Sequence, residues 1–193
     1  MPTFPYSVAS VIAYGDTAPM VELVGQRVRL RELREDDAAL IHPGASDPVV
    51  VRYMSWGPND LAASEAFVAR SIAAQREDPR PQYALVIEAC EDGRFLGVTG
   101  FDPDPDQAGH ATMGYWLMPQ EWGKGYATDA ASLVVRYALS DGGMSQVSAS
   151  ASVDNPASQR VLAKAGLRRI GPGTFTHENG TVFEAVTFAA ASP

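Results

Sequence analysis

Gly123 and Gly125 flank Lys124 at a junction between a strand-like run and a helix-like run. Apolar residues recur at a spacing of two in the seven residues 111–117 and at helical spacing in 130–138. Glycine has no Cβ, so the backbone at this junction can approach a ligand closely. The first N–H groups of a helix have no intrahelical partner, and the helix dipole adds roughly half a positive charge there. The stretch 120–127 therefore favours a bound phosphate, although a tight turn with nothing bound gives the same glycine spacing.

Two other phosphate-binding motifs fail at this stretch. A P-loop needs Ser or Thr after Gly-Lys and a further glycine five residues before that Gly, whereas Gly125 follows Lys124 and Met118 occupies the earlier position. A dinucleotide fingerprint needs a third glycine where Thr128 stands, and an acidic residue near 145–147, where the sequence is Ser-Gln-Val. The glycine pair must therefore be explained by another motif.

The stretch is similar to the acyl-CoA loop of the GNAT family of N-acetyltransferases, whose pattern Gln/Arg-x-x-Gly-x-Gly/Ala is matched by Gln120, Gly123 and Gly125. Further segments resemble the branch of that family that includes the ribosomal-protein N-terminal acetyltransferases. These segments are Arg52-Tyr53-Met54-Ser55-Trp56, Gly114-Tyr115-Trp116-Leu117, Tyr126-Ala127-Thr128-Asp129-Ala130, Asn155-Pro156-Ala157-Ser158 and Lys164-Ala165-Gly166-Leu167. With several segments matched in order, the empty-turn interpretation loses most of its weight.

The resemblance implies an α/β (α+β) fold, a single GNAT-like domain with a central mixed, mostly antiparallel sheet flanked by helices. It also implies acetyl-CoA as a cosubstrate, attacked directly by an amine in a ternary complex, with no metal. Backbone N–H groups near Leu117 and Met118 would polarise the thioester carbonyl. The expected CoA-binding residues are Leu117, Met118, Gln120, Gly123, Lys124, Gly125, Tyr126, Ala127, Asn155 and Ser158.

The base is harder to assign, because the Glu that relatives often carry two residues before the Gly-Tyr is Thr112 here. His110 titrates in the right range and is the candidate base, although a surface histidine at a strand start is an alternative. Glu65 and Glu121 are weaker candidates. The base that is needed depends on the acceptor, because an α-amino group has a pKa of about 7.7 to 8.0 and a lysine amine about 10.4.

The general acid is also displaced, because Leu162 stands where many relatives have a tyrosine. Ser158 is the candidate that donates to the departing thiolate or contacts the CoA arm. Alternatively, Ser158 caps its own helix, and Asn155 has the same ambiguity. Tyr53, Met54, Trp56 and Trp116 are expected at the acceptor, with plain core packing as the alternative.

The composition is that of one globular domain: 193 residues, 46% hydrophobic and 20% charged. The net charge of -8 and the absence of a basic run argue against nucleic acid and suit a cationic amine acceptor. The lone Cys90 lies in an apolar run and is expected to be a small core residue. No signal peptide or membrane span is predicted, so the cytoplasm is the expected compartment.

Residues 1–23 show no clear period and are predicted as an N-terminal arm or extension; a loose arm, a remnant of cloning and a segment that packs on another subunit of a homodimer are all open. The domain is predicted over 24–193.

Asp102-Pro103-Asp104-Pro105-Asp106 is expected to be an exposed loop, and its prolines and spacing count against a calcium site. Strands are expected at 24–33, 82–89, 94–101, 111–117, 146–152, 167–170 and 181–189, and helices from Arg34 to Pro43, at 61–75 after an Asn59 or Asp60 cap, from Tyr126 to about 139, and from Pro156 to Gly166.

Three functions fit these residues. The leading one is transfer of an acetyl group from acetyl-CoA to a protein N-terminus or a small amine. The second uses a different donor or acceptor, such as succinyl-CoA or an aminoglycoside. The third is a noncatalytic acyl-CoA-binding module, which the departures at Thr112 and Leu162 leave open.

Overall fold

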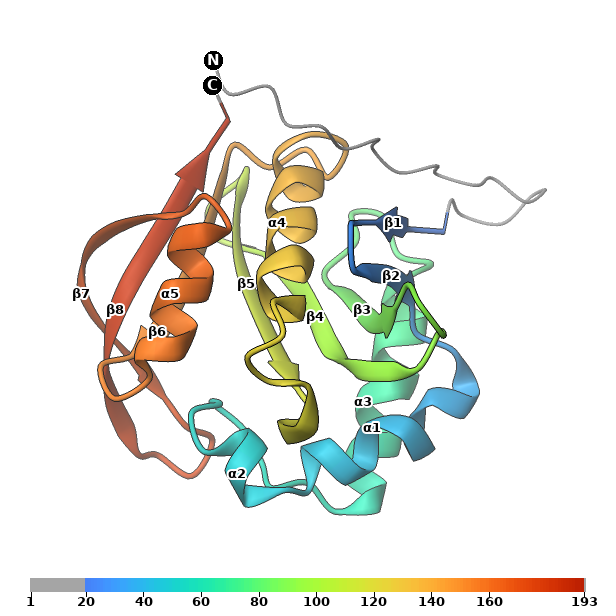
Figure 1. The fold of residues 1–193 in the computed structure, drawn as a ribbon. Helices are drawn as coiled ribbons and strands as arrows, with labels where there is room; N and C mark the ends of the chain where they lie inside the picture. The colour runs from blue at the N-terminus through green and yellow to red at the C-terminus, as the bar shows by residue number, and fades with distance from the viewer. Residues whose placement is uncertain (1–19, 193) are drawn as a thin grey trace.

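The computed structural model describes residues 20–192, which form one eight-stranded sheet in the order β1-β2-β3-β4-β5-β6-β8-β7 (Figure 1). All neighbouring strands are antiparallel except β5 and β6. The predicted mixed, mostly antiparallel sheet flanked by helices is confirmed. The strands are β1 Glu22–Val24, β2 Val28–Glu32, β3 Tyr83–Ala89, β4 Phe95–Pro103, β5 His110–Leu117, β6 Gln146–Ser152, β7 Arg168–Thr176 and β8 Val182–Ala191.

Helices cover both faces of the sheet, and successive residues of the central strands feed two cores. Leu85 and Ile87 of β3 pack in the core beneath helices α4 and α5, whereas Val86 packs on the opposite face beneath α1 and α3. Because these strands are buried on both faces, their sequences lack the alternation of apolar and polar residues that a half-exposed strand shows. The helical elements are η1 Glu35–Asp37, α1 Ala38–Ala45, α2 Pro48–Val51, α3 Leu61–Ala74, η2 Pro119–Glu121, α4 Tyr126–Leu139 and α5 Pro156–Lys164.

Strands β5 and β6 diverge along most of their length. β5 and β6 pair only where His110, Ala111 and Thr112 lie beside residues 146–148. Beyond that point β5 continues to Leu117 and β6 to Ser152 without a shared register. A gap therefore opens between the strands, and β5 leads from it directly into the glycine loop.

The first predicted strand is wrong, because 24–33 is not one strand. β1 and β2 form a hairpin whose turn is closed by the Gly25 N–H donating to the Val28 carbonyl at 2.8 Å. The apolar residues continue on both sides of Gly25, which hides the turn from a pattern search. The sheet begins at Glu22, inside the segment that was predicted as an arm, and residues 1–19 lie outside the described part.

Helix α1 also differs from its prediction, because it runs past Pro43 and Gly44 to Ala45. Proline removes one N–H donor and so leaves the carbonyl four residues earlier without its helical partner. That carbonyl belongs to Ala39, which is exposed, so water can satisfy it. The helix therefore continues through a residue that usually stops one.

Strand β4 extends two residues into the predicted loop. Asp102 pairs with Thr112, and Pro103 pairs with Ala111. The Met118 N–H donates to the Leu96 carbonyl, so every second β4 residue from Leu96 to Asp102 directs its backbone N–H and C=O toward β5. The backbone of Pro103 is directed to the other side, where β3 has already ended, so the N–H that proline lacks is not needed by a neighbouring strand.

Two further expectations need correction at the ends of strands. Cys90 is exposed, because β3 ends at Ala89, so it is not a core residue. β7 runs from Arg168 to Thr176 and not only to Ile170, since it pairs with β8 as far as Val182.

Candidate active site

The glycine loop has the backbone of an anion site. Gly123 and Gly125 both have positive φ, 77° and 86°, and Gly125 is the N-cap of α4. A Cβ on Gly123 would meet nothing within 4 Å, so this glycine faces open space. Within residues 20–192, the backbone N–H groups from Gly123 to Ala127 donate to no protein acceptor. Several unused donors thus converge at the positive end of a 14-residue helix.

The β1–β2 turn is hydrogen-bonded to this loop and to the first turn of α4, through contacts that the sequence did not reveal. The backbone N–H groups of Arg27 and Val28 donate to Asp129 Oδ2 at 2.7 and 3.2 Å, and the Arg27 guanidinium donates to the Lys124 carbonyl at 3.2 Å. A Cβ on Gly25 would lie 2.6 Å from Asp129 Oδ2, so a larger residue would push the Asp129 carboxylate out of these hydrogen bonds. These residues are about a hundred positions apart, which is why no local pattern finds them.

Lys124 is engaged with the loop's own carboxylate. Its Nζ lies 3.1 Å from Glu121 Oε2, and Arg94 approaches the same buried carboxylate at 3.4 Å. The hydrogen bonds from Arg94 and then Lys124 lower the pKa of Glu121, although burial opposes them. A carboxylate held ionised by two cations is a poor proton acceptor, so Glu121 is not the base.

The two predicted carbonyl-polarising N–H groups face opposite ways. Met118 N–H donates to the Leu96 carbonyl at 2.9 Å and is therefore occupied. Because N–H directions alternate along an antiparallel strand, the Leu117 N–H points away from β4, toward the gap. The Leu117 carbonyl accepts from Trp122 Nε1 at 2.8 Å, which fixes the peptide beside that N–H. Gln120 is exposed at the start of the loop.

Ser158 meets a partner that the sequence analysis did not identify. Tyr115 of β5 places its hydroxyl 2.8 Å from Ser158 Oγ of α5. Burial raises the pKa of Tyr115 to about 12, although the Ser158 hydrogen bond opposes that shift. Asn155 Oδ1 accepts from the Ser158 N–H at 3.0 Å, so Asn155 is the cap of α5 and the Ser158 hydroxyl is not. Tyr115 lies on the predicted strand, but no spacing rule pairs it with Ser158.

A pocket of about 650 Å³ lies at the gap and takes its walls from both faces of the sheet. Its walls include Thr112 to Trp116 of β5 and Ala149 to Ser152 of β6. Ser158 and Leu162 of α5 contribute on one face, and α1, α3 and the segment after α2 contribute on the other. The pocket can therefore receive one molecule from each side of the sheet.

The predicted acceptor residues do line this pocket together: Tyr53, Met54, Trp56 and Trp116. Tyr53 also donates from its hydroxyl to the Asp154 carbonyl at 3.1 Å, which bridges two loops across the gap. Trp116 is only 7% exposed and packs edge-on against Phe95, so it belongs to the hydrophobic core as well as to the pocket wall.

The structure does not bring the candidate bases His110 and Glu65 to the pocket wall. His110 is the first residue of β5, two positions before Thr112, and two strand residues span roughly 6.8 Å. Glu65 is exposed on α3. Among the groups that do line the pocket is Asp102, which the sequence analysis had assigned to an exposed loop.

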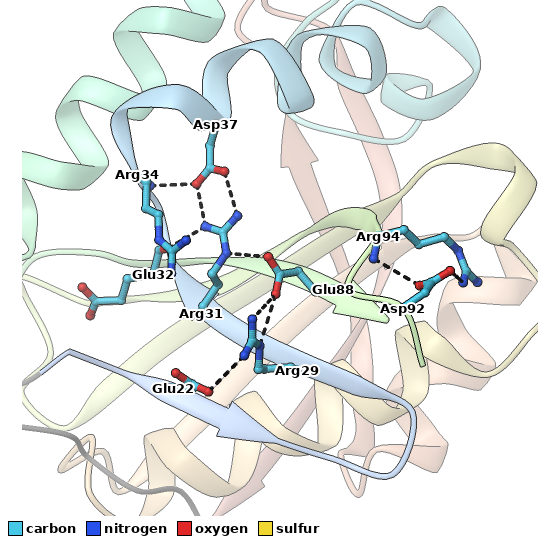
Figure 2. A network of polar contacts seen from close by, with 9 residues as sticks. All are labelled: Glu22, Arg29, Arg31, Glu32, Arg34, Asp37, Glu88, Asp92 and Arg94. Carbon is cyan, nitrogen blue, oxygen red and sulfur yellow. Dashed lines mark hydrogen bonds and ion pairs between the residues drawn. The ribbon is translucent and has the colours of Figure 1, made fainter. Parts of the chain in front are cut away.

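A buried charge network, drawn in Figure 2, sets the position of α1. Ile41 and Ala45 of α1 form part of the pocket wall. Arg31 of β2 donates to both carboxylate oxygens of Asp37, at 2.7 and 2.8 Å, and to Glu88 at 2.6 Å. Desolvation raises the pKa of Glu88, but hydrogen bonds from Arg29 and Arg31 outweigh it, and the pKa is lowered. Asp37 closes η1 immediately before α1, so the network ties the pocket helices to the sheet.

Known proteins share this architecture. A family model described as an acetyltransferase (GNAT) domain matches residues 27–168. The chain belongs to the GNAT family. Among curated relatives, the uncharacterized N-acetyltransferase YoaA of Bacillus subtilis is 28% identical over 170 residues, covering 86% of this chain and 94% of the relative.

Solved structures share the GNAT fold with this chain. RimJ of Mycobacterium smegmatis, in complex with CoA-disulfide, superposes with a TM-score of 0.72 at 23% identity, over 85% of this chain and 81% of that one. The microcin C7 self-immunity acetyltransferase MccE, in complex with acetyl-CoA and AMP, gives 0.72 at 20% identity over 86% and 93%. Spermidine N-acetyltransferase of Vibrio cholerae, in complex with CoA and spermine, gives 0.72 at 16% identity over 86% and 95%.

In the part of the chain from 20 to 192, no three His, Cys, Asp or Glu side chains are grouped as a metal site. None of the helices found there is both long enough and apolar enough to cross a membrane.

Proposed function

We propose that this GNAT domain transfers the acetyl group of acetyl-CoA to a primary amine, by direct attack within a ternary complex. The observation that carries the proposal is the gap between β5 and β6, which continues into the glycine loop at one end and opens into the pocket on both faces. The donor would enter from the α4–α5 side and the acceptor from the α1–α3 side. The relatives named as N-acetyltransferases support this assignment.

The CoA pyrophosphate would bind the free N–H groups from Gly123 to Ala127, with Gln120 at the loop's edge. Lys124 adds less charge than the sequence suggests, because Glu121 partly neutralises it. Asn155 acts on the CoA arm indirectly, by fixing the first turn of α5 and with it Ser158.

Leu117 N–H would polarise the thioester carbonyl. It points into the gap, and the next peptide, 117–118, is held by the Trp122 hydrogen bond to the Leu117 carbonyl, so the N–H is oriented before the substrate arrives. Preorganised donors of this kind lower a barrier by about 2.7 to 4 kcal/mol. Met118 positions this peptide through its bond to Leu96 and does not bind the carbonyl itself.

Ser158 and Tyr115 would stabilise the departing thiolate by hydrogen bonding. A CoA thiol resembles a cysteine thiol, with a pKa of roughly 8.5, whereas the pKa of Tyr115 is about 12. Full proton transfer from Tyr115 to the thiolate is therefore uphill by several units. The pair donates a hydrogen bond as the C–S bond breaks, and the thiolate takes its proton from water.

The first test is the thermal midpoint of the purified protein with and without acetyl-CoA. Ligand at about 100 times its dissociation constant adds roughly 2.7 kcal/mol, which for a chain of this size raises the midpoint by roughly 5 to 11 °C. No shift with acetyl-CoA or CoA would remove the glycine loop as the donor site. A shift with succinyl-CoA that acetyl-CoA does not give would reassign the donor.

A further inference from the structure

Two carboxylates line the acceptor pocket within the described chain, Asp102 and Glu178. Glu178 is already hydrogen-bonded within the protein, because its Oε1 accepts from the Gly57 N–H at 3.0 Å and its own N–H donates to the Ser55 carbonyl at 2.8 Å. These bonds anchor the β7–β8 turn against the segment after α2. Asp102 has no ion pair within residues 20–192.

The position of Asp102 follows from the β4–β5 ladder. Asp102 pairs directly with Thr112, so the two side chains project from the same face of the sheet. Directly opposed residues have Cβ atoms about 4.5 to 5.5 Å apart. Asp102 therefore stands beside the point where β5 leaves β6, at the acceptor end of the gap.

The surroundings of Asp102 are aromatic on one side. Phe67 of α3, Trp56 and Trp116 line the pocket and pack on the α1–α3 face of the sheet. Solvent reaches Asp102 through the open pocket, yet the protein atoms around it exclude enough water to raise its pKa, and a hydrogen bond from Gln82 only partly opposes this. Such a carboxylate gains when a cation binds to it or when it takes a proton.

The other charged or titratable groups around the pocket are Arg70 on α3, Glu178 on the β7–β8 turn, and the phenols of Tyr53, Tyr83 and Tyr115. One ladder step outward lie Asp104 and His110, outside the wall. Arg70 forms no ion pair with Asp102. A cationic acceptor can therefore reach Asp102 without displacing a bound arginine.

We propose that Asp102 accepts the proton of the acceptor's ammonium group through water in the open pocket, and that the acceptor is a primary alkylamine whose apolar chain lies against the aromatic wall. This inference rests on the proposed acetyl transfer. An alkylamine has a pKa near 10.4, so it arrives protonated and needs a base, unlike an α-amino group. Asp102 would fill the role that the sequence analysis gave to His110.

The proton and electron balance is simple. The ammonium gives one proton to Asp102, which returns it to water. The neutral amine nitrogen attacks the thioester carbon, the C–N bond forms, and the nitrogen loses a second proton through Asp102. The C–S bond then breaks with its electron pair on sulfur, and the thiolate takes one proton from water. One amide, one thiol and one net proton result.

The test compares Asp102→Asn with Asp104→Asn. Asp104 is a matched control, because it lies on the same segment outside the pocket, and its Oδ1 accepts from the N–H groups of Asp106 and Gln107, which an Asn can preserve. Thiol release from acetyl-CoA is followed with tyramine, butane-1,4-diamine and alanine amide, from about pH 5 to about pH 9. Acetyl-CoA thermal shifts check that donor binding survives.

For Asp102→Asn we expect kcat/KM for tyramine and the diamine to fall by about 10² or more, with the thermal shift kept. In the wild type, kcat/KM should fall as pH drops through the pKa of Asp102, because the protonated acid is no base. The raised pKa places that fall above the range of a solvated aspartate. This limb should vanish in Asp102→Asn and persist in Asp104→Asn.

Unchanged kcat/KM and an unchanged acid limb in Asp102→Asn would overturn the inference while leaving acetyl transfer intact. A preference for alanine amide over both alkylamines would overturn the acceptor class. If the wild type releases no thiol with any amine, the proposed function fails, and calorimetry of tyramine binding to the CoA-bound protein decides Asp102. Binding that Asp102→Asn weakens at least tenfold, and Asp104→Asn does not, supports the ammonium site, whereas equal or absent binding overturns it.

Discussion

The donor loop and the acceptor pocket are built in opposite ways. The loop uses backbone: two positive-φ glycines and the first turn of α4 present N–H groups, and its side chains pair with one another. The pocket uses side chains from β4, β5, α3, α5 and the β7–β8 turn. A backbone site leaves a short motif in the sequence, whereas an assembled pocket leaves none. The donor can therefore be inferred from eight residues, and the acceptor only from the fold.

The pocket depends on the buried charge network that the loop does not use, and Arg31→Met should have the largest effect. Removing the guanidinium leaves Asp37 as a buried carboxylate without its charge partner and leaves Glu88 with Arg29 alone, which costs about 3 to 5 kcal/mol. The free energy of unfolding from urea titration measures this loss. Arg29→Met is the control, because Arg29 is 44% exposed and its pair contributes about 1 kcal/mol or less.

The same network gives a pH dependence with a definite sign. Because the pKa of Glu88 is lowered in the fold, its contribution is present above the unfolded pKa and is lost as pH falls through the folded value. Acid should therefore destabilise the wild type more than it destabilises Arg31→Met. Parallel losses in both proteins would remove the network from the account.

The loop should fail by a single backbone change, with the pocket intact. In Gly123→Asp, the positive φ costs roughly 1 to 2 kcal/mol and the new carboxylate repels phosphate. We expect the affinity for CoA to fall by about 100-fold or more, measured by calorimetry. Gly143→Asp is the control, since Gly143 also has positive φ, 72°, and open space, but lies beyond the far end of α4. Equal losses in both variants would contradict the assignment.

Ser158 lies where the two regions meet, so its loss should affect turnover and not donor binding. A hydrogen bond to a charged group contributes about 1.5 to 3 kcal/mol, so Ser158→Ala should lower kcat roughly 10- to 100-fold. Tyr115→Phe should have a smaller effect in the same direction, because it acts through Ser158. Ser148→Ala on β6 is the control. If kcat is unchanged in Ser158→Ala, the thiolate is stabilised elsewhere.

The smallest effect should come from the support behind the loop. Arg27→Ala removes one hydrogen bond to the Lys124 carbonyl, which contributes about 1 kcal/mol. We expect the dissociation constant for CoA to rise about fivefold with kcat unchanged, because the backbone bonds to Asp129 remain. A drop in kcat with no change in affinity would show that Arg27 acts on the chemistry instead.

The same contrast explains what the sequence could predict. Local signals predicted two features correctly: Asp60 caps α3 through the Ala63 N–H, and β6 has the predicted bounds. They failed where long-range pairing decides. Asp102 looked like part of a loop until pairing with Thr112 drew it into the sheet, and Tyr115 found Ser158 only through tertiary packing.

Departures from the family pattern have a similar lesson. Thr112 and Leu162 suggested a missing base and a missing acid, and kept a noncatalytic module open. Yet a carboxylate stands across the ladder from Thr112, and a phenol-hydroxyl pair lies one turn of α5 before Leu162. A role lost at one position can reappear on a neighbouring element, which a residue-by-residue comparison does not detect.

The most direct test of the account is thiol release from acetyl-CoA by the wild-type protein with a panel of primary amines, with the amine product weighed by mass spectrometry. The account predicts one acetylated amine for each thiol released, and no release without an amine. A protein that shows the acetyl-CoA thermal shift yet releases no thiol with any amine would contradict it, and would make the gap between β5 and β6 a binding site and not a catalytic one.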